Sequence, residues 1–145
     1  MNTAEKHGWN DLEDYLRIML RVVEDDPFVV GHTLQITGIS LEAGEISGDV
    51  LCHGHIILDV RKHFEIRTRR NRKEARTVRY AYHARYENGE NILRYDNAHP
   101  PEHLGHPTRH HKHDWRSGRE EISHVGNDWP HLSEVLDELQ ESVWK

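Results

Sequence analysis

The chain has 145 residues, of which 35% are apolar, and its formal net charge is −6. This length suits one ordinary domain with one core, so we expect residues 1–145 to form a single domain. No apolar run approaches the ~20 residues that a membrane-spanning helix needs, and the first residues lack the apolar segment of a signal peptide. One cysteine excludes an internal disulfide framework, so the sequence predicts a cytoplasmic protein with no membrane partner.

Apolar residues at helical spacing predict a first helix over residues 9–24, where Trp9, Leu12 and Leu16 begin the pattern. Asp25-Asp26-Pro27 ends this helix, because the residue before a proline is pushed out of the helical region.

Residues 28–97 read as a sheet, because their segments are rich in Val, Ile and Thr or alternate between apolar and polar side chains. The alternation is clearest before Tyr86, where Tyr80 and Tyr82 would face the core, and His83 and Arg85 would face away. Asn88-Gly89 is a strong hairpin signal before the next strand.

Histidines dominate the following segment, residues 98–114, which contains six of the fourteen in the chain. Prolines interrupt it, so we expect an exposed His-rich loop. Pro130 then opens a C-terminal helix over about residues 130–143. These elements predict an α+β fold, with an antiparallel sheet of about four or five strands and the N-terminal and C-terminal helices packed on one face.

Positive charge is concentrated in residues 61–85, which hold ten of the nineteen Lys and Arg residues and two of the acidic ones. Such a segment in an acidic protein favours contact with the phosphates of a nucleic acid, and RNA is the expected partner. The alternative is a solvated hairpin tip whose charges prevent aggregation. The predicted nucleic-acid-binding residues are Arg67, Arg69, Arg70, Arg72, Lys73, Arg76, Arg79 and Arg85.

Four short motifs in fixed order resemble the TumE family, a group of small toxins from bacterial and archaeal toxin–antitoxin pairs. They are Y-A-Y-H at 80–83, E-N-G-E at 87–90, R-Y-D-N-A at 94–98 and H-H-K-H at 110–113. Thr108 and Arg109 separate Pro107 from the last motif, which departs from the tighter family pattern. The resemblance implies a cytoplasmic toxin with a cognate antitoxin, usually one that has a DNA-binding domain, and it implies no particular reaction.

The residue types favour metal-independent RNA cleavage, which needs a base, an acid and cations around the phosphate. His110, His111 and His113 would exchange protons near neutral pH. Lys112 and Arg94 would stabilise negative charge, and Asp96 would orient a histidine. This reaction uses no metal and no cofactor.

Two alternatives remain open from the sequence. One is a metal-dependent hydrolase on the His-rich loop, although its spacing matches no closed zinc pattern and it contains no cysteine. The other is a non-catalytic module that binds nucleic acid or protein. An exposed edge strand or the terminal helix could also form a homodimer.

Overall fold

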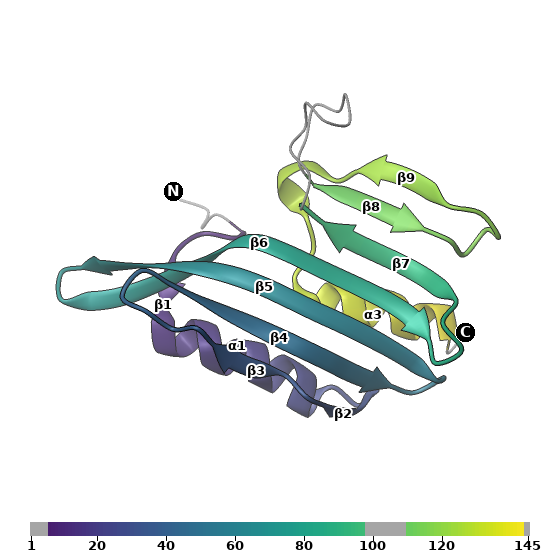
Figure 1. Ribbon diagram of the computed structural model, residues 1–145, viewed down its shortest axis with the longest axis horizontal. Coiled ribbons are helices and arrows are strands. Elements are labelled where there is room, and N and C mark those ends of the chain that lie inside the picture. Colours follow the sequence, from purple (N-terminus) through teal and green to yellow (C-terminus); the bar gives the residue numbers. More distant parts are fainter. Residues whose placement is uncertain (1–5, 98–109, 144–145) are drawn as a thin grey trace.

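The computed structural model describes residues 6–97 and 110–143. Nine strands of the described residues form one antiparallel sheet with the order β2-β4-β5-β6-β7-β8-β9, in which β1 pairs with β6 and β3 with β4 (Figure 1). The strands are β1 (Asn10–Asp11), β2 (Val29–His32), β3 (Gln35–Thr37), β4 (Ala43–Cys52), β5 (Ile56–Arg69), β6 (Arg72–Tyr86), β7 (Asn91–Asp96), β8 (His111–Asp114) and β9 (Glu121–His124). The helices are α1 (Leu12–Asp25) and α3 (Leu132–Val143). A 3₁₀ turn at Gly126–Asp128 precedes α3.

The expected α+β fold with a sheet of about four or five strands and terminal helices is wrong. The described residues form a mostly-sheet fold of nine strands with only two α-helices. The additional strands are two to four residues long, and they pair through backbone hydrogen bonds rather than through an apolar pattern that a sequence would display. The segment after Phe28 forms two short strands, β2 and β3, which both pair with β4, and β8 and β9 extend the sheet beyond β7.

The His-rich segment accounts for part of this difference. Residues 98–109 lie outside the described residues, but His111–Asp114, which the sequence analysis assigned to the loop, form β8. The edge of β7 supplies the backbone partners, since the two strands are antiparallel and Leu93 pairs with Asp114 and Asp96 with His111.

Both helices lie on the same side of the sheet (Figure 1) and bury their apolar faces against it. The Asp11 side chain accepts a hydrogen bond from the backbone N–H of Asp14 and so caps α1. Pro27 follows α1 within two residues, as the sequence analysis expected. The core joins Met19 and Val23 of α1, four side chains of α3 and the inward residues of β4–β7, and its largest fully buried side chains include Phe28, Phe64, Tyr80, Tyr82, Leu58, Leu136 and Leu139.

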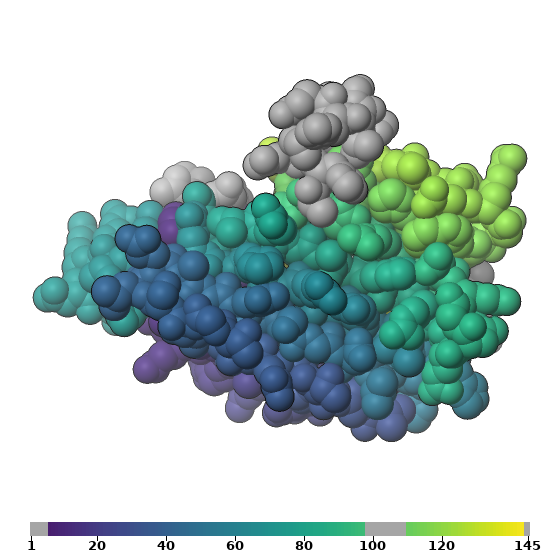
Figure 2. All heavy atoms as spheres, in the orientation of Figure 1, coloured from purple at the N-terminus to yellow at the C-terminus, as the bar shows by residue number. Residues whose placement is uncertain are grey.

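The opposite face of the sheet has no described helix over it, and Figure 2 shows the side chains of β4–β7 at the surface of this side. Side chains alternate between the two faces, so this open face receives the polar residues of each strand. In β6, for example, Tyr82 and Ala84 are buried, whereas His83 and Arg85 are partly exposed. We call this side of the sheet the open face.

The β5–β6 hairpin is the longest pair of strands, and its tip extends past the rest of the sheet (Figure 1). Arg70 and Asn71 form the turn with φ angles of 51° and 63°. Positive φ at both central positions matches the twist of the flanking strands, although neither residue is glycine. The turn therefore places arginine at a position with a backbone cost, and at the most exposed point of the hairpin.

No described helix combines the length and the apolar character needed to cross a membrane.

Close packing between β4 and β5 generates a stability prediction. Gly44 pairs with Phe64, and a Cβ at Gly44 would overlap the buried Phe64 ring. Gly44→Ala should lower the free energy of unfolding by about 1–3 kcal/mol, because the ring must leave its packed position. Gly31→Ala is the matched control, since a Cβ at Gly31 meets no described atom within 4 Å, and it should change stability by less than about 0.5 kcal/mol. Equal urea midpoints for the two variants would contradict the packing described here.

Candidate functional site

A row of polar residues crosses the open face from β5 to β8. The register pairs Asp59 with His83, His83 with Arg94, and Arg94 with His113. Directly paired residues share a face of the sheet. The four side chains therefore lie next to one another, although their strands are far apart in the sequence. A groove of about 210 Å³ opens on this row, and its lining includes Asp59, Arg61, His83 and Arg94.

Arg94 lies at the centre of the row. Its Nε donates to Oδ2 of Asp96 at 2.8 Å, and Asp96 is almost fully buried. The guanidinium has five N–H donors in a rigid fork. The hydrogen bond to Asp96 therefore fixes the orientation of the fork and leaves its terminal amino groups beside the groove.

His113 lies between two carboxylates. Its Nε2 is 3.8 Å from Oδ2 of Asp96, and its Nδ1 is 3.3 Å from Oε2 of Glu120. Both ring nitrogens of a protonated imidazole donate hydrogen bonds. Both ring nitrogens of His113 therefore face carboxylate oxygens.

His83 has a different environment on the other side of Arg94. Its Nε2 is 2.7 Å from Oδ1 of Asn91, so with the amide oxygen as acceptor the proton is on Nε2. In the neutral ring, Nδ1 then becomes the acceptor. One histidine of the row thus presents a hydrogen-bond acceptor, while the other is held by groups that accept from it.

Trp115 contacts both histidines. Its ring centroid is 6.1 Å from that of His83 and 6.0 Å from that of His113, with the His113 ring stacked at 16°. Trp115 also lines a larger cavity of about 580 Å³ together with Tyr86, Asn91 and Arg116. An aromatic ring therefore connects the polar row to a cavity large enough for a planar group.

The structure brings together four of the six predicted catalytic residues and separates the other two. Arg94, Asp96, His111 and His113 share the open face, where Asp96 pairs directly with His111. His111 has no exposed surface, so it cannot meet a ligand directly in this conformation. His111 therefore does not lie in an exposed loop, as the sequence analysis expected, but is buried in β8.

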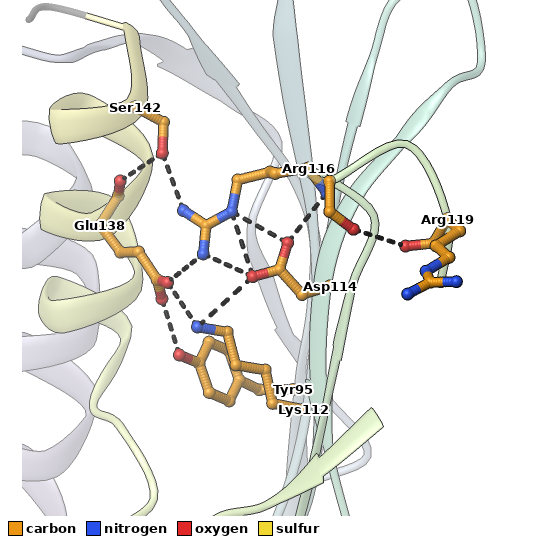
Figure 3. Close-up of polar contacts among 8 residues, drawn as sticks. Tyr95, Lys112, Asp114, Arg116, Arg119, Glu138 and Ser142 are labelled. Atoms are coloured by element: carbon orange, nitrogen blue, oxygen red, sulfur yellow. Dashed lines mark hydrogen bonds and ion pairs between the residues drawn. The ribbon is translucent and has the colours of Figure 1, made fainter. Parts of the chain in front are cut away.

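Lys112 points to the opposite side, where it joins a cluster that fastens β8 to α3 (Figure 3). Lys112 Nζ is 2.5 Å from Oε2 of Glu138, and Arg116 Nη2 is 2.7 Å from the same oxygen. Tyr95 donates to the other oxygen of Glu138 at 2.6 Å, and Arg116 also binds Asp114. This set, Tyr95, Lys112, Asp114, Arg116 and Glu138, is the helix-side cluster.

Charge pairing holds the helix-side cluster ionised. Hydrogen bonding to Arg116 lowers the pKa of Asp114 to about 2. Burial alone would raise the pKa of Glu138, but hydrogen bonds from Lys112, Tyr95 and Arg116 hold it below its usual value. Lys112 is thus committed to a structural ion pair and is not available on the open face.

His110 is also turned away from the row. Its Nδ1 is 2.9 Å from the Tyr80 hydroxyl, and its ring stacks at 5.3 Å from Trp129. Trp129 stacks in turn on Tyr80 at 4.1 Å. His110 therefore belongs to an aromatic stack at the junction of β6 and the segment before α3.

The predicted catalytic and nucleic-acid-binding residues do not include His83, Trp115 or Glu120. Alternation in β6 had placed His83 on the same face as Arg85, which was the available signal for it. Glu120 reaches His113 only because β8 and β9 pair, which no local pattern indicated.

The eight predicted nucleic-acid-binding residues fall into two groups. Arg67 pairs with Glu74 at 2.8 Å and Arg76 with Glu65 at 2.5 Å, and both guanidinium groups stack on Trp9 at 4.2 and 4.6 Å. The other six have no ion pair within the described ranges, and they are Arg69, Arg70, Arg72, Lys73, Arg79 and Arg85. The free positive charge of the hairpin is therefore concentrated at its tip.

Within residues 6–97 and 110–143, no group of three His, Cys, Asp or Glu side chains is arranged to hold a metal ion. His99, His103 and His106 lie outside the described residues.

Fold and site define a small single-sheet protein with a helix-covered core and an open face that carries titratable side chains. A sequence model of the family described as Toxin TumE matches residues 19–143. The chain therefore belongs to the TumE family, and it is a toxin of a toxin–antitoxin system whose partner is an antitoxin. No curated protein and no solved structure matches the chain.

The helix-side cluster generates a second prediction. Glu138→Gln should lower the free energy of unfolding by about 1–3 kcal/mol, because Lys112 and Arg116 lose the charge that they share. Glu141→Gln is the matched control on the same helix, since Glu141 is exposed and has no ion pair within the described ranges; it should cost less than about 0.5 kcal/mol. Urea unfolding of both variants measures the difference, and equal losses would show that the cluster does not anchor β8.

Proposed function

We propose that this toxin is a metal-independent endoribonuclease whose reaction takes place on the open face. The observation that carries the proposal is the row His83–Arg94–His113, in which two histidines in different hydrogen-bonding states flank one arginine. RNA cleavage by internal attack needs these three components, namely a base, an acid and a cation.

His83 is the proposed base. Its Nδ1 would take the proton of the ribose 2′-hydroxyl, and the 2′-oxygen would attack the adjacent phosphorus. His113 is the proposed acid, because its two ring nitrogens face the carboxylates of Asp96 and Glu120 across the row from His83. It would give its proton to the departing 5′-oxygen, so the products are a 2′,3′-cyclic phosphate and a 5′-hydroxyl.

Arg94 is the proposed cation for the phosphate. The two histidines lie on the strands either side of β7, so their backbones are separated by two strand spacings, or about 10 Å. A phosphate above Arg94 would lie between them. The terminal amino groups of the fork would bind its oxygens as charge increases in the transition state.

RNA binding has two supports outside the row. Trp115 is placed to stack on an unpaired base beside the reacting phosphate. The unpaired basic residues of the hairpin tip, with Arg79 between tip and row, would follow the RNA backbone along β6.

The cognate antitoxin would carry a DNA-binding domain, and the toxin would act in the cytoplasm.

Cleavage of a single-stranded RNA by the purified toxin in EDTA tests the reaction. His83→Ala and His113→Ala should each lower the rate about 10²–10⁴-fold, as expected for loss of a general base or acid. His63→Ala is the control, because His63 lies on β5 next to Glu45 and outside the row. Products ending in 2′,3′-cyclic phosphate are expected in every active sample.

Activity that disappears in EDTA and returns with zinc or nickel would contradict the metal-independent reaction. Full activity in both histidine variants would refute the assignment of the row. A toxin that binds RNA with no cleavage in any condition would instead be a non-catalytic binding module.

The hairpin tip generates a separate prediction for affinity. Replacing Arg69, Arg72 and Lys73 with Gln should reduce the slope of log K against log salt for single-stranded RNA by about 2, because three phosphate contacts are lost. The double variant Arg67→Gln and Arg76→Gln should change the slope much less, since both guanidinium groups already pair with glutamates. A slope that is the same in the triple variant and the wild type would restrict the tip to a role in solubility.

A further inference from the structure

A second cavity, of about 410 Å³, lies on the helix side of the sheet, away from the open face. Residues of α1, β5, β6 and the chain before β1 surround it, together with His131 at the start of α3. Its described lining contains two lysines and two histidines and no Asp or Glu. In a chain with a net charge of −6, this cavity is locally positive or neutral.

Lys62 is the most unusual residue of this cavity. It points from β5 toward α1 and is only 6% exposed, yet it has no carboxylate partner within the described ranges. The amine lies 3.2 Å from the sulfur of Met19 and 5.2 Å from the centre of the Tyr15 ring. A thioether and an aromatic face compensate poorly for the lost hydration of an ammonium group.

Burial lowers the pKa of Lys62 to about 7, because removal from water penalises the charged amine. Burial also lowers the pKa of His7 to about 4, and it lowers that of His131, so both rings are neutral around pH 7. An anion in the cavity would remove the free-energy cost of burying the protonated amine of Lys62, because an opposite charge favours the protonated form.

Two further groups could bind such an anion. The Tyr15 hydroxyl is 2.6 Å from Oγ1 of Thr77, and both residues line the cavity. Lys6 lies at the rim, where Asp128 and Glu134 hold it at 3.0 Å. The cavity therefore offers a buried amine, a hydroxyl pair and a fixed second cation.

We propose that this cavity binds the oxyanion group of a small molecule, a phosphate or a carboxylate, with Lys62 as its principal ligand. The remaining volume accommodates the body of that molecule beside Ile18 and Met19 of α1. This site is separate from the proposed RNA site, because Lys62 and its neighbours face the helices rather than the open face.

Isothermal titration calorimetry tests the proposal. The toxin is titrated with inorganic phosphate and, separately, with acetate, and sodium chloride keeps the ionic strength constant. Wild-type toxin should bind at least one of the two anions, and Lys62→Met should weaken that binding at least about tenfold. Arg21→Met is the control, because Arg21 is an exposed cation of α1 that does not line the cavity, and this variant should bind like the wild type. Tighter binding of phosphate or of acetate identifies which oxyanion the natural ligand carries.

A second measurement keeps the test decisive if Lys62→Met does not fold. In wild-type toxin with ¹³C-labelled lysine, the Lys62 Cε resonance should move on addition of the bound anion. The resonance of Lys112, which pairs with Glu138 outside the cavity, should not move. Absence of binding, equal affinity in Lys62→Met, or an unmoved Lys62 resonance would each overturn the proposal.

Discussion

The alternation of side chains along β8 is the constraint on which the site depends. Four consecutive residues send His111 and His113 to the open face, and Lys112 and Asp114 to the helix side. Lys112 donates directly to Glu138 of α3, and Asp114 is joined to Glu138 through Arg116, by charge-assisted hydrogen bonds that are stronger than neutral ones (Figure 3). A one-residue slip of β8 would exchange the two sets, so the ion pairs with α3 also fix which histidines face the open side.

The same division of faces separates stability from chemistry in the rest of the molecule. The helices and the apolar side of β4–β7 form the core, and Phe64, Tyr82 and Leu139 are fully buried there. The open face contributes little to that apolar core, and its residues His83, Arg94 and His113 are the ones that we propose for the toxic function. Lys62 is the exception, since it places a charged group in the helix side with only a thioether and a ring beside it.

Much of the central sheet and both helices could be predicted from the sequence. Long alternating runs predicted β5 and β6, and the apolar spacing from Leu12 onward predicted α1, because those patterns record burial directly. Strands β1, β3, β8 and β9 could not be predicted in this way. They are short, and what defines them is the backbone partner that another part of the chain provides.

The site shows the same limit. The sequence placed Arg94 and Asp96 near the histidines, because β7 leads directly into the His-rich segment. It could not separate the four residues of H-H-K-H, because that requires knowing that they form a strand with a period of two. The register of β8 places His113 beside Arg94 on the open face, and Lys112 on the helix side, where it pairs with Glu138. His83 lies beside Arg94 on the other neighbouring strand, β6.

The most direct test of the account is a nuclear magnetic resonance titration with a single-stranded RNA oligonucleotide in which every 2′-hydroxyl is methylated, so that internal attack cannot cleave it. The account predicts that the ring resonances of His83, His113 and Trp115 shift together on binding. Those of His32 and His131, on other parts of the surface, should remain in place. Shifts confined to His131 or to the helices, with the His83 and His113 rings unmoved, would contradict an RNA site on the open face.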